Sequence, residues 1–170
     1  ILAGLDSATS GSVRLMEAQL SDMNEEERAI ARGKYTGFIF QSFQLLMSLT
    51  ARENVMLPAE LRGDEQAESQ ALELLEKVGL DSRSNHYPNQ LSGGEQQRVA
   101  IARAFASRPE IMFADEPTGN LDTKTGSLVT ELLFDLNREF GTTLVLVTHD
   151  AGLASRCDRT ISIASGRVVL

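Results

Sequence analysis

The stretch that decides the fold is Leu91-Ser92-Gly93-Gly94-Glu95-Gln96-Gln97-Arg98, and a helical run from Val99 to Ala104 follows it. Ser92 can accept from the backbone N–H of Glu95 while the Glu95 carboxylate reaches back, which predicts a capping box and a helix start. Capping does not require two consecutive glycines, because each costs up to about 1 kcal/mol of helix propensity relative to alanine. Glycines at this position let a ligand approach the N–H groups of a helix N-terminus, where phosphate binds well. The stretch therefore indicates a phosphate site as well as a helix start.

A second informative stretch is Ile111-Met112-Phe113-Ala114-Asp115-Glu116. Its four apolar residues predict a buried strand that ends at two adjacent carboxylates. Ligands of open α/β sheets bind at the carboxyl ends of the strands, so the acids are candidate site residues. Taken alone, an acid after a strand is more often part of a loop or a helix cap. Asp122, a little further along, can equally cap the helix that follows.

Two more polar side chains directly follow apolar strands. His149 comes soon after Leu144-Val145-Leu146-Val147, and Gln41 comes after Phe38-Ile39-Phe40. Either residue alone says little, since a solitary histidine is usually structural. Because the carboxyl ends of parallel strands meet at one edge of a sheet, His149 and Glu116 are expected to lie side by side.

Together these motifs resemble those of the ATP-binding cassette (ABC) ATPases, in the family's order and over essentially the whole chain. The resemblance implies that ATP and Mg²⁺ are the cofactors. It also implies that Glu116 polarises the attacking water, that His149 contacts the γ-phosphate, and that Asp115 serves the metal. The residues implied are Glu116, His149 and Gln41 for catalysis, Ser92, Gly93, Gly94 and Asp122 for nucleotide binding, and Asp115 and Gln41 for the metal.

Alternation of short apolar strands with helical patterns predicts an α/β protein with parallel βαβ units. The resemblance refines this expectation to a P-loop NTPase (RecA-like) fold with a mostly parallel sheet and an inserted helical subdomain. Residues 1–41 and 107–170 would form the core, and residues 42–106 the helical subdomain with the signature motif. The continuous apolar strands are expected to be buried on both faces. A hairpin is expected near the end, from 160–163 and 168–170.

Three helices have clear sequence signals. One follows the N-cap Asn24, and one with an apolar face ends at Gly79. A third ends at Gly141 and is expected to bury a single stripe of apolar residues. The stripe consists of Leu128, Val129, Leu132, Leu133 and Leu136.

One part of the family's machinery has no counterpart in this sequence. P-loop enzymes hold the β- and γ-phosphates with a glycine-rich loop that ends in Gly-Lys-Ser or Gly-Lys-Thr. None of the three lysines, Lys34, Lys77 and Lys124, has Gly before it and Ser or Thr after it. The chain is therefore expected to lack the Walker A loop and the family's N-terminal strands, like a domain cut just after its P-loop. As such it is expected neither to bind ATP tightly nor to hydrolyse it.

Composition excludes several classes of protein. With 170 residues, 42% of them hydrophobic and 24% charged, the chain suits one globular domain and no disordered tail. Its net charge of −8 argues against nucleic-acid binding, and no apolar run approaches the length of a membrane-spanning helix. A single cysteine, Cys157, favours the cytosol. We expect a cytoplasmic protein without direct membrane insertion.

The resemblance also implies the partners. Two ATPase subunits would dimerise head to tail, each ATP lying between one subunit's Walker motifs and the other's signature, and they would drive a transmembrane permease. The protein would then be peripheral at the inner face of the cytoplasmic membrane. Stretches such as Phe40-Gln41-Ser42-Phe43 resemble the bacterial subgroup that includes lipoprotein-releasing and macrolide-export ATPases.

Two alternatives stay open. A non-transport ATPase of the DNA-repair or chromosome type would insert a long coiled coil after Gln41, but only about fifty residues separate Gln41 from Ser92, without sustained heptads. A non-catalytic remnant of an ABC protein is compatible with the missing Walker A loop.

Overall fold

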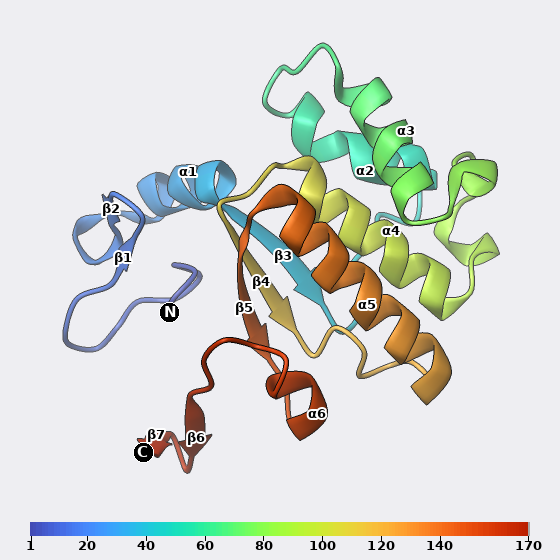
Figure 1. The fold of residues 1–170 in the computed structure, drawn as a ribbon. Coiled ribbons are helices and arrows are strands. Elements are labelled where there is room, and N and C mark those ends of the chain that lie inside the picture. The colour runs from blue at the N-terminus through green and yellow to red at the C-terminus, as the bar shows by residue number, and fades with distance from the viewer. Residues whose placement is uncertain (170) are drawn as a thin grey trace.

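The computed structural model describes residues 1–169 and is built around a parallel β-sheet (Figure 1). The strands of this sheet, in spatial order, are β3 (Thr36–Phe40), β4 (Ile111–Asp115) and β5 (Thr143–Val147). Phe40 is in register with Asp115, and Asp115 with Val147. The three strands therefore end together, and the residues that follow them meet at one edge of the sheet. The three strand predictions are confirmed.

Helices α4 (Gly93–Ala106) and α5 (Thr123–Phe140) pack side by side over one face of the sheet (Figure 1). The main core lies between them and the buried strand residues Ile39 and Met112. Gly37 shows how closely α4 approaches, because a Cβ there would lie 2.9 Å from the carbonyl oxygen of Ala104. A backbone atom cannot move aside, so this position of β3 requires glycine.

The expectation that the strands are buried on both faces is wrong. Alternate residues of a strand point to opposite faces, and Phe38 and Phe113 lie on the face away from α4 and α5, where both are partly exposed. Among residues 1–169 this second face is covered mainly at its amino-terminal end, where Ile111 packs on a smaller cluster around Leu15 and Leu20. Apolar sequence alone does not show which face a helix covers.

Between β3 and β4 the described chain contains helices and turns only. The helices are α2 (Ala51–Glu60), α3 (Ala67–Lys77) and α4, with short 3-10 turns η2 (Asp81–Arg83) and η3 (Pro88–Gln90). Helix α3 buries the expected apolar face, and Gly79 with φ +67° follows its end, as predicted. The subdomain boundaries at 41/42 and 106/107 stay a prediction.

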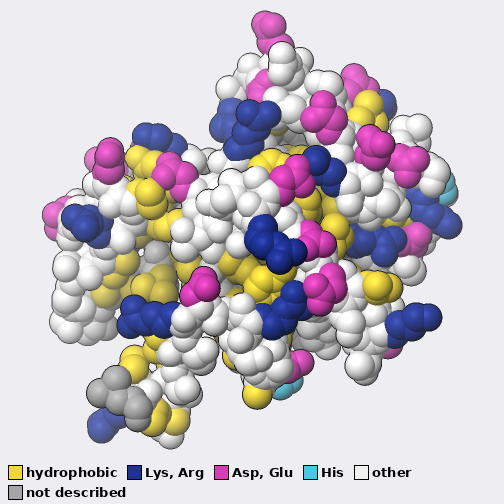
Figure 2. Space-filling view, in the orientation of Figure 1, with side chains coloured by type: hydrophobic (Ala, Val, Ile, Leu, Met, Phe, Trp, Pro, Cys, Tyr) yellow, Lys and Arg dark blue, Asp and Glu magenta, His cyan; other side chains and the backbone are white. Residues whose placement is uncertain are grey.

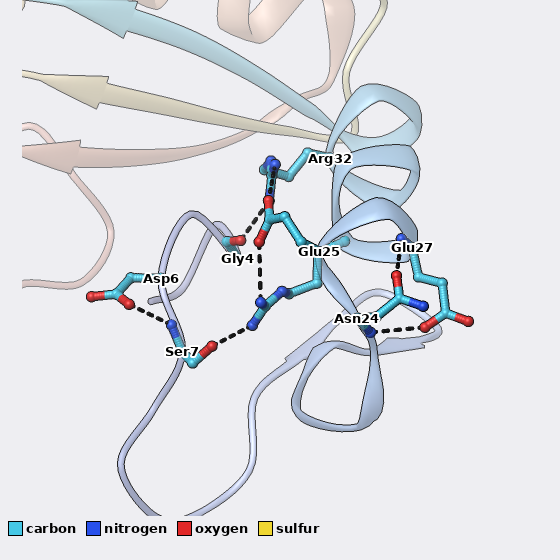
Figure 3. Close-up of polar contacts among 8 residues, drawn as sticks. Gly4, Asp6, Ser7, Asn24, Glu25, Glu27 and Arg32 are labelled. Atoms are coloured by element: carbon cyan, nitrogen blue, oxygen red, sulfur yellow. Dashed lines mark hydrogen bonds and ion pairs between the residues drawn. The ribbon is translucent and has the colours of Figure 1, made fainter.

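The amino-terminal segment is held against helix α1 (Glu25–Tyr35) by polar contacts (Figure 3). Arg28 donates to Ser7 Oγ at 2.5 Å, and Arg32 donates to the Gly4 carbonyl at 2.5 Å. The N-cap predicted at Asn24 is present, and it forms a capping box with Glu27. Before α1 lie a hairpin of β1 (Arg14–Leu15) and β2 (Ala18–Gln19) and the turn η1 (Leu20–Asp22).

The apolar stripe of α5 needs one correction. Val129, Leu133 and Leu136 are buried, and Gly141 ends the helix at φ +64° as predicted, but Leu128 is 60% exposed. Successive helix residues differ by about 100° around the axis, so Leu128 falls outside the stripe that begins at Val129.

After β5 the chain forms a short helix and the expected hairpin. These elements are α6 (Ala151–Ala154), β6 (Ser162–Ala164) and β7 (Arg167–Val169). The last residue of the hairpin prediction, residue 170, lies outside the described part of the chain. Charged side chains of both signs are spread over the face in Figure 2, with hydrophobic ones between them. Across residues 1–169, the longest apolar helical stretch falls short of what crossing a bilayer requires.

Candidate active site

The candidate site lies at the edge where the parallel strands end. Glu116 is the first residue after β4, and its backbone N–H donates to the Val147 carbonyl at 2.9 Å, which extends the pairing of β4 with β5 by one bond. Glu116 adopts φ +44°, a left-handed conformation that few residues other than glycine adopt. Strained backbone of this kind concentrates at functional sites. Glu116 is thus the first candidate for a reactive side chain.

The Glu116 carboxylate is held by His149 through two contacts. Its Oε1 atom accepts from the backbone N–H of His149 at 3.0 Å and lies 2.7 Å from the ring Nδ1. The expectation that these two residues lie side by side is confirmed. The Glu116 side chain is 23% exposed and that of His149 is 85% exposed, so the pair faces solvent. Hydrogen bonding to Glu116 raises the pKa of His149 above its usual value.

A polar cavity of about 430 Å³ adjoins this pair. It is bounded by the loop after β4, the first turns of α5, and the loop that leads from β5 into α6. Glu116, Asp122, Thr148, His149 and Asp150 are among its lining residues. Of the site residues expected from the sequence, Glu116, Asp122 and His149 are therefore gathered at this cavity.

Two of these acids also cap helices. Asp122 accepts from the N–H groups of Lys124 and Thr125, both at 3.1 Å, and the hydrogen bonds with Thr125 lower the pKa of Asp122. Asp150 caps α6 in the same way. The capping role that the sequence left open for Asp122 is thus present.

Asp115 is the last residue of β4 and Gln41 directly follows the neighbouring strand β3, and both are exposed. Within residues 1–169 no group of three or more His, Cys, Asp or Glu side chains could hold a metal ion on its own. Mg²⁺ in nucleotide sites is usually held by one or two carboxylates together with the substrate's phosphates. An exposed carboxylate at this edge of the sheet fits an ion that arrives with its nucleotide.

The signature stretch starts α4 as predicted. Ser92 and Glu95 form the capping box, and these bonds lower the pKa of Glu95. Ser92 and Gly93 are exposed, whereas Gly94 is buried, and a Cβ at Gly94 would lie 2.4 Å from Cγ2 of Thr125 on α5. The second glycine is therefore required for helix packing, which the sequence did not indicate. Ser92, Gly93 and Gly94 do not line the cavity beside Glu116.

A family model described as "ABC transporter" matches residues 1–119. The chain belongs to the ABC transporter family. The family expected from the signature and the acidic strand end is thereby confirmed.

Relatives of this ABC chain place it near two kinds of ATP-binding protein. It is 58% identical over 170 residues to the "Uncharacterized ABC transporter ATP-binding protein YbbA" of Escherichia coli (strain K12), covering 99% of this chain and 75% of YbbA. It is 48% identical over 170 residues to the "Lipoprotein-releasing system ATP-binding protein LolD" of Xanthomonas axonopodis pv. citri (strain 306), covering 99% of this chain and 70% of LolD. The subgroup expected from the sequence is thus confirmed.

The fold is confirmed by a solved structure. The ABC chain matches the ATP-binding cassette MJ0796, in a dimeric post-hydrolysis state bound to ADP and Pi, with a TM-score of 0.86 and 44% sequence identity. The match covers 98% of this chain and 74% of that one. The α/β cassette fold expected from the motifs is therefore correct.

Sequence reasoning missed several polar residues that hold the site's loops in this ABC domain. Gln97 is fully buried on α4 and donates to the Pro117 carbonyl at 2.6 Å. Arg103, further along α4, donates to the carbonyls of Phe43 and Gln44. In the sequence, such residues could be noticed only as polar residues on a helix face that is otherwise apolar. That pattern does not reveal which loop each of them holds.

Proposed function

We propose that this protein is the ATP-hydrolysing subunit of a bacterial ABC transporter, of the export or lipoprotein-release type. The observation that carries the proposal is the pairing of Glu116 with His149 beside Asp115, at the carboxyl edge of β4 and β5. This arrangement brings a carboxylate and a protonatable ring together beside one polar cavity, and the Asp115 carboxylate at the end of the same strand is the candidate metal ligand. These groups match what phosphoryl transfer to water requires.

Each residue has a distinct role in this proposal. Asp115 and Gln41 would hold Mg²⁺, which neutralises charge on the phosphates when it is bound. Glu116 orients and polarises the attacking water as a general base. His149, whose pKa is raised by Glu116, is readily protonated and would donate to the γ-phosphate.

The proposed site is completed by a second copy of the chain. Ser92 and Gly93 are exposed and lie outside the Glu116 cavity, so they are free to contact a nucleotide bound to another subunit. The helical subdomain, residues 42–106, would carry this signature across the interface, with Gly94 and Asp122 completing the nucleotide-binding set. The printed title of the MJ0796 structure describes that relative as dimeric, which supports the arrangement.

The partner in the membrane would be a permease, as the lipoprotein-releasing system named for the LolD relative suggests. A mainly apolar cavity of about 740 Å³ lies between α1, β3, α2 and α4, and we propose it as the docking face. Lys34, Arg62 and Arg103 line it, which favours a permease segment with acidic residues beside apolar ones. Such docking would keep the protein at the cytoplasmic face of the membrane.

The docking face can be tested by co-purification. Leu61, 80% exposed, lines this cavity, so Leu61→Asp should strongly reduce the permease recovered with the full-length protein. Leu128→Asp is the matched control, because Leu128 is also exposed but lies on α5. Equal permease recovery with both variants would argue against this face.

The catalytic proposal is tested with Glu116→Gln in the full-length protein. We expect ATP binding to persist while hydrolysis slows by about two to four orders of magnitude, the usual contribution of a positioned general base. Glu139→Gln is the control, because Glu139 is an exposed residue of α5 paired with Lys77. Unchanged turnover in Glu116→Gln would remove Glu116 from the mechanism.

A second candidate function is that of a non-catalytic ABC remnant. Lys34, Lys77 and Lys124 do not stand in a Gly-Lys-Ser or Gly-Lys-Thr sequence, which is also compatible with a non-catalytic ABC remnant. We propose that the 170-residue polypeptide alone binds ATP weakly, and micromolar binding would contradict this. An in-frame Gly-Lys-Ser or Gly-Lys-Thr encoded just before Ile1 would support the ATPase, and its absence would support the remnant.

A further inference from the structure

Gln41 and Asn120 form a mutual pair between two loops that are 79 positions apart in sequence. Asn120 Nδ2 donates to the backbone carbonyl of Gln41 at 2.8 Å, and Gln41 Nε2 donates to Asn120 Oδ1 at 3.2 Å. Gln41 follows β3, whereas Asn120 lies in the loop between β4 and α5. The two loops of the candidate site are thus joined by one pair of side-chain contacts.

The chemistry of this pair fixes the orientation of both amides. A backbone carbonyl can only accept, so Asn120 must present its NH₂ group to Gln41 O. The carboxamide oxygen of Asn120 is then the atom that faces the Gln41 side chain. Gln41 must therefore donate to it with its own NH₂ group. This leaves Oε1 of Gln41, the only atom of that amide able to bind a cation, turned away from Asn120.

Gly119 supports the same orientation by leaving room for Gln41. A Cβ at Gly119 would lie 2.7 Å from Gln41 Nε2 and 3.2 Å from Gln41 Cδ, so the amide lies directly on the Gly119 backbone. The N–H of Gly119 in turn donates to the Glu116 carbonyl at 3.0 Å. One short turn therefore connects the Gln41 amide to the residue that holds His149.

Stability does not account for this pair, because Gln41 and Asn120 are both exposed and hydrogen bonds in water contribute little net free energy. We propose that Asn120 is a positioning residue, which orients the Gln41 amide so that its oxygen is presented as a ligand. That the ligand is for Mg²⁺ rests on the proposed function, whereas the orientation of the Gln41 amide does not depend on it.

The first test measures the orientation without nucleotide. In the full-length protein, the side-chain NH₂ signals of Gln41, assigned with Gln41→Ala, should shift and exchange faster with water in Asn120→Ala. Gly119→Ala should have the same effect, because its methyl group displaces the amide. Asn89→Ala, at an exposed asparagine in η3, is the control and should leave the Gln41 signals unchanged. Gln41 signals that are identical in Asn120→Ala and wild type would overturn the proposal.

The second test measures the consequence for the cation. Asn120→Asp keeps the shape but places a carboxylate oxygen against the Gln41 carbonyl, so it should disrupt the pair as Asn120→Ala does. Both variants should raise the Mg²⁺ concentration needed for half-maximal ATP hydrolysis by about tenfold at saturating ATP, a typical effect of losing a residue that orients a metal ligand. In a Gln41→Ala background, Asn120→Ala should have no further effect on that concentration.

The two tests separate this inference from the function. If wild-type protein hydrolyses no ATP, the proposed function fails while the Gln41 signals still decide the orientation. If hydrolysis is normal and Asn120→Ala changes its Mg²⁺ requirement equally with and without Gln41, the positioning role is wrong.

Discussion

At the scale of single residues, Glu116 concentrates the unusual features of the molecule. It combines a left-handed backbone with a carboxylate that takes both a backbone and a ring contact from His149. A left-handed backbone at a non-glycine residue costs free energy and persists only where neighbouring contacts hold it. Here the bond from Glu116 N–H to Val147 and the two bonds from His149 supply those contacts.

Removing the Glu116 charge should lower the pKa of His149. Glu116 favours the charged imidazolium, so Glu116→Gln should bring the pKa down towards the usual histidine value. NMR titration of the His149 ring measures this, and Glu131→Gln is the control because Glu131 pairs with Arg156 instead. An unchanged His149 titration in Glu116→Gln would contradict the pairing.

The same shift sets a pH window for the Glu116 contact. Because the folded-state pKa of His149 is raised, the ion pair is fully present below the usual histidine pKa and is lost as pH rises through the raised value. The phosphate binding proposed for His149 should weaken over that interval, since only the charged ring can donate from both nitrogens.

At the scale of elements, the packing of α4 on α5 depends on the second signature glycine. Gly94→Ala should destabilise the protein by about 1–3 kcal/mol, because the new methyl group would overlap Thr125 and overpacking has that cost. Gly93→Ala is the matched variant. Its methyl group would meet only ordinary contacts at 3.7 Å, so its stability should stay the same or rise slightly.

Denaturant unfolding of both variants measures the difference, and Thr125→Ser offers a rescue. Serine removes the obstructing Cγ2 but keeps the hydroxyl, so Gly94→Ala with Thr125→Ser should recover most of the lost stability. Equal stability of Gly93→Ala and Gly94→Ala would show that the helices do not pack as described.

Sequence predicted those elements whose signals are local. The N-cap at Asn24, the capping box at Ser92 and the stop at Gly141 depend on residues within one or two helical turns, so short-range chemistry was sufficient. Which face of the sheet is covered depends on distant segments, and the burial of both faces was therefore predicted wrongly. Leu128 was misplaced because the buried stripe of α5 is one residue narrower than the apolar pattern of the sequence.

The contacts at and around the candidate site also separate into those that the sequence predicts and those that it does not. Glu116 and His149 could be predicted to meet, because strand ends of one parallel sheet share an edge. Asn54, fully buried and bonded to the backbone of Leu46, Leu49 and Thr50, could not be assigned that role, since its partners are fixed by the path of a loop. Asn120 was missed for the same reason.

At the scale of the whole molecule, the separation of the signature from the Glu116 cavity predicts complementation between subunits. Gly93→Asp should block the signature by repelling phosphate, and Glu116→Gln should block the catalytic carboxylate, so each variant alone should be nearly inactive. A mixed dimer contains one site with both defects and one site with neither. Equal mixing should therefore restore about a quarter of wild-type hydrolysis if subunits exchange freely.

ATP turnover of the full-length variants, alone and mixed, measures this. No recovery in samples where subunit exchange is demonstrated would mean that Gly93 acts on the nucleotide of its own subunit. Wild-type protein carried through the same mixing procedure controls for losses during exchange.

Helix α4 touches three separate parts of the molecule along its length. Its first turn meets Thr125, and Gln97 in its second turn donates to the Pro117 carbonyl. Arg103, nearer its end, donates to the carbonyls of Phe43 and Gln44. Because an α-helix is stiff, it cannot tilt at one of these points and stay still at the others. A displacement of the segment after Gln41 is therefore expected to move α4 as a rigid rod and, with it, the first turn of α5.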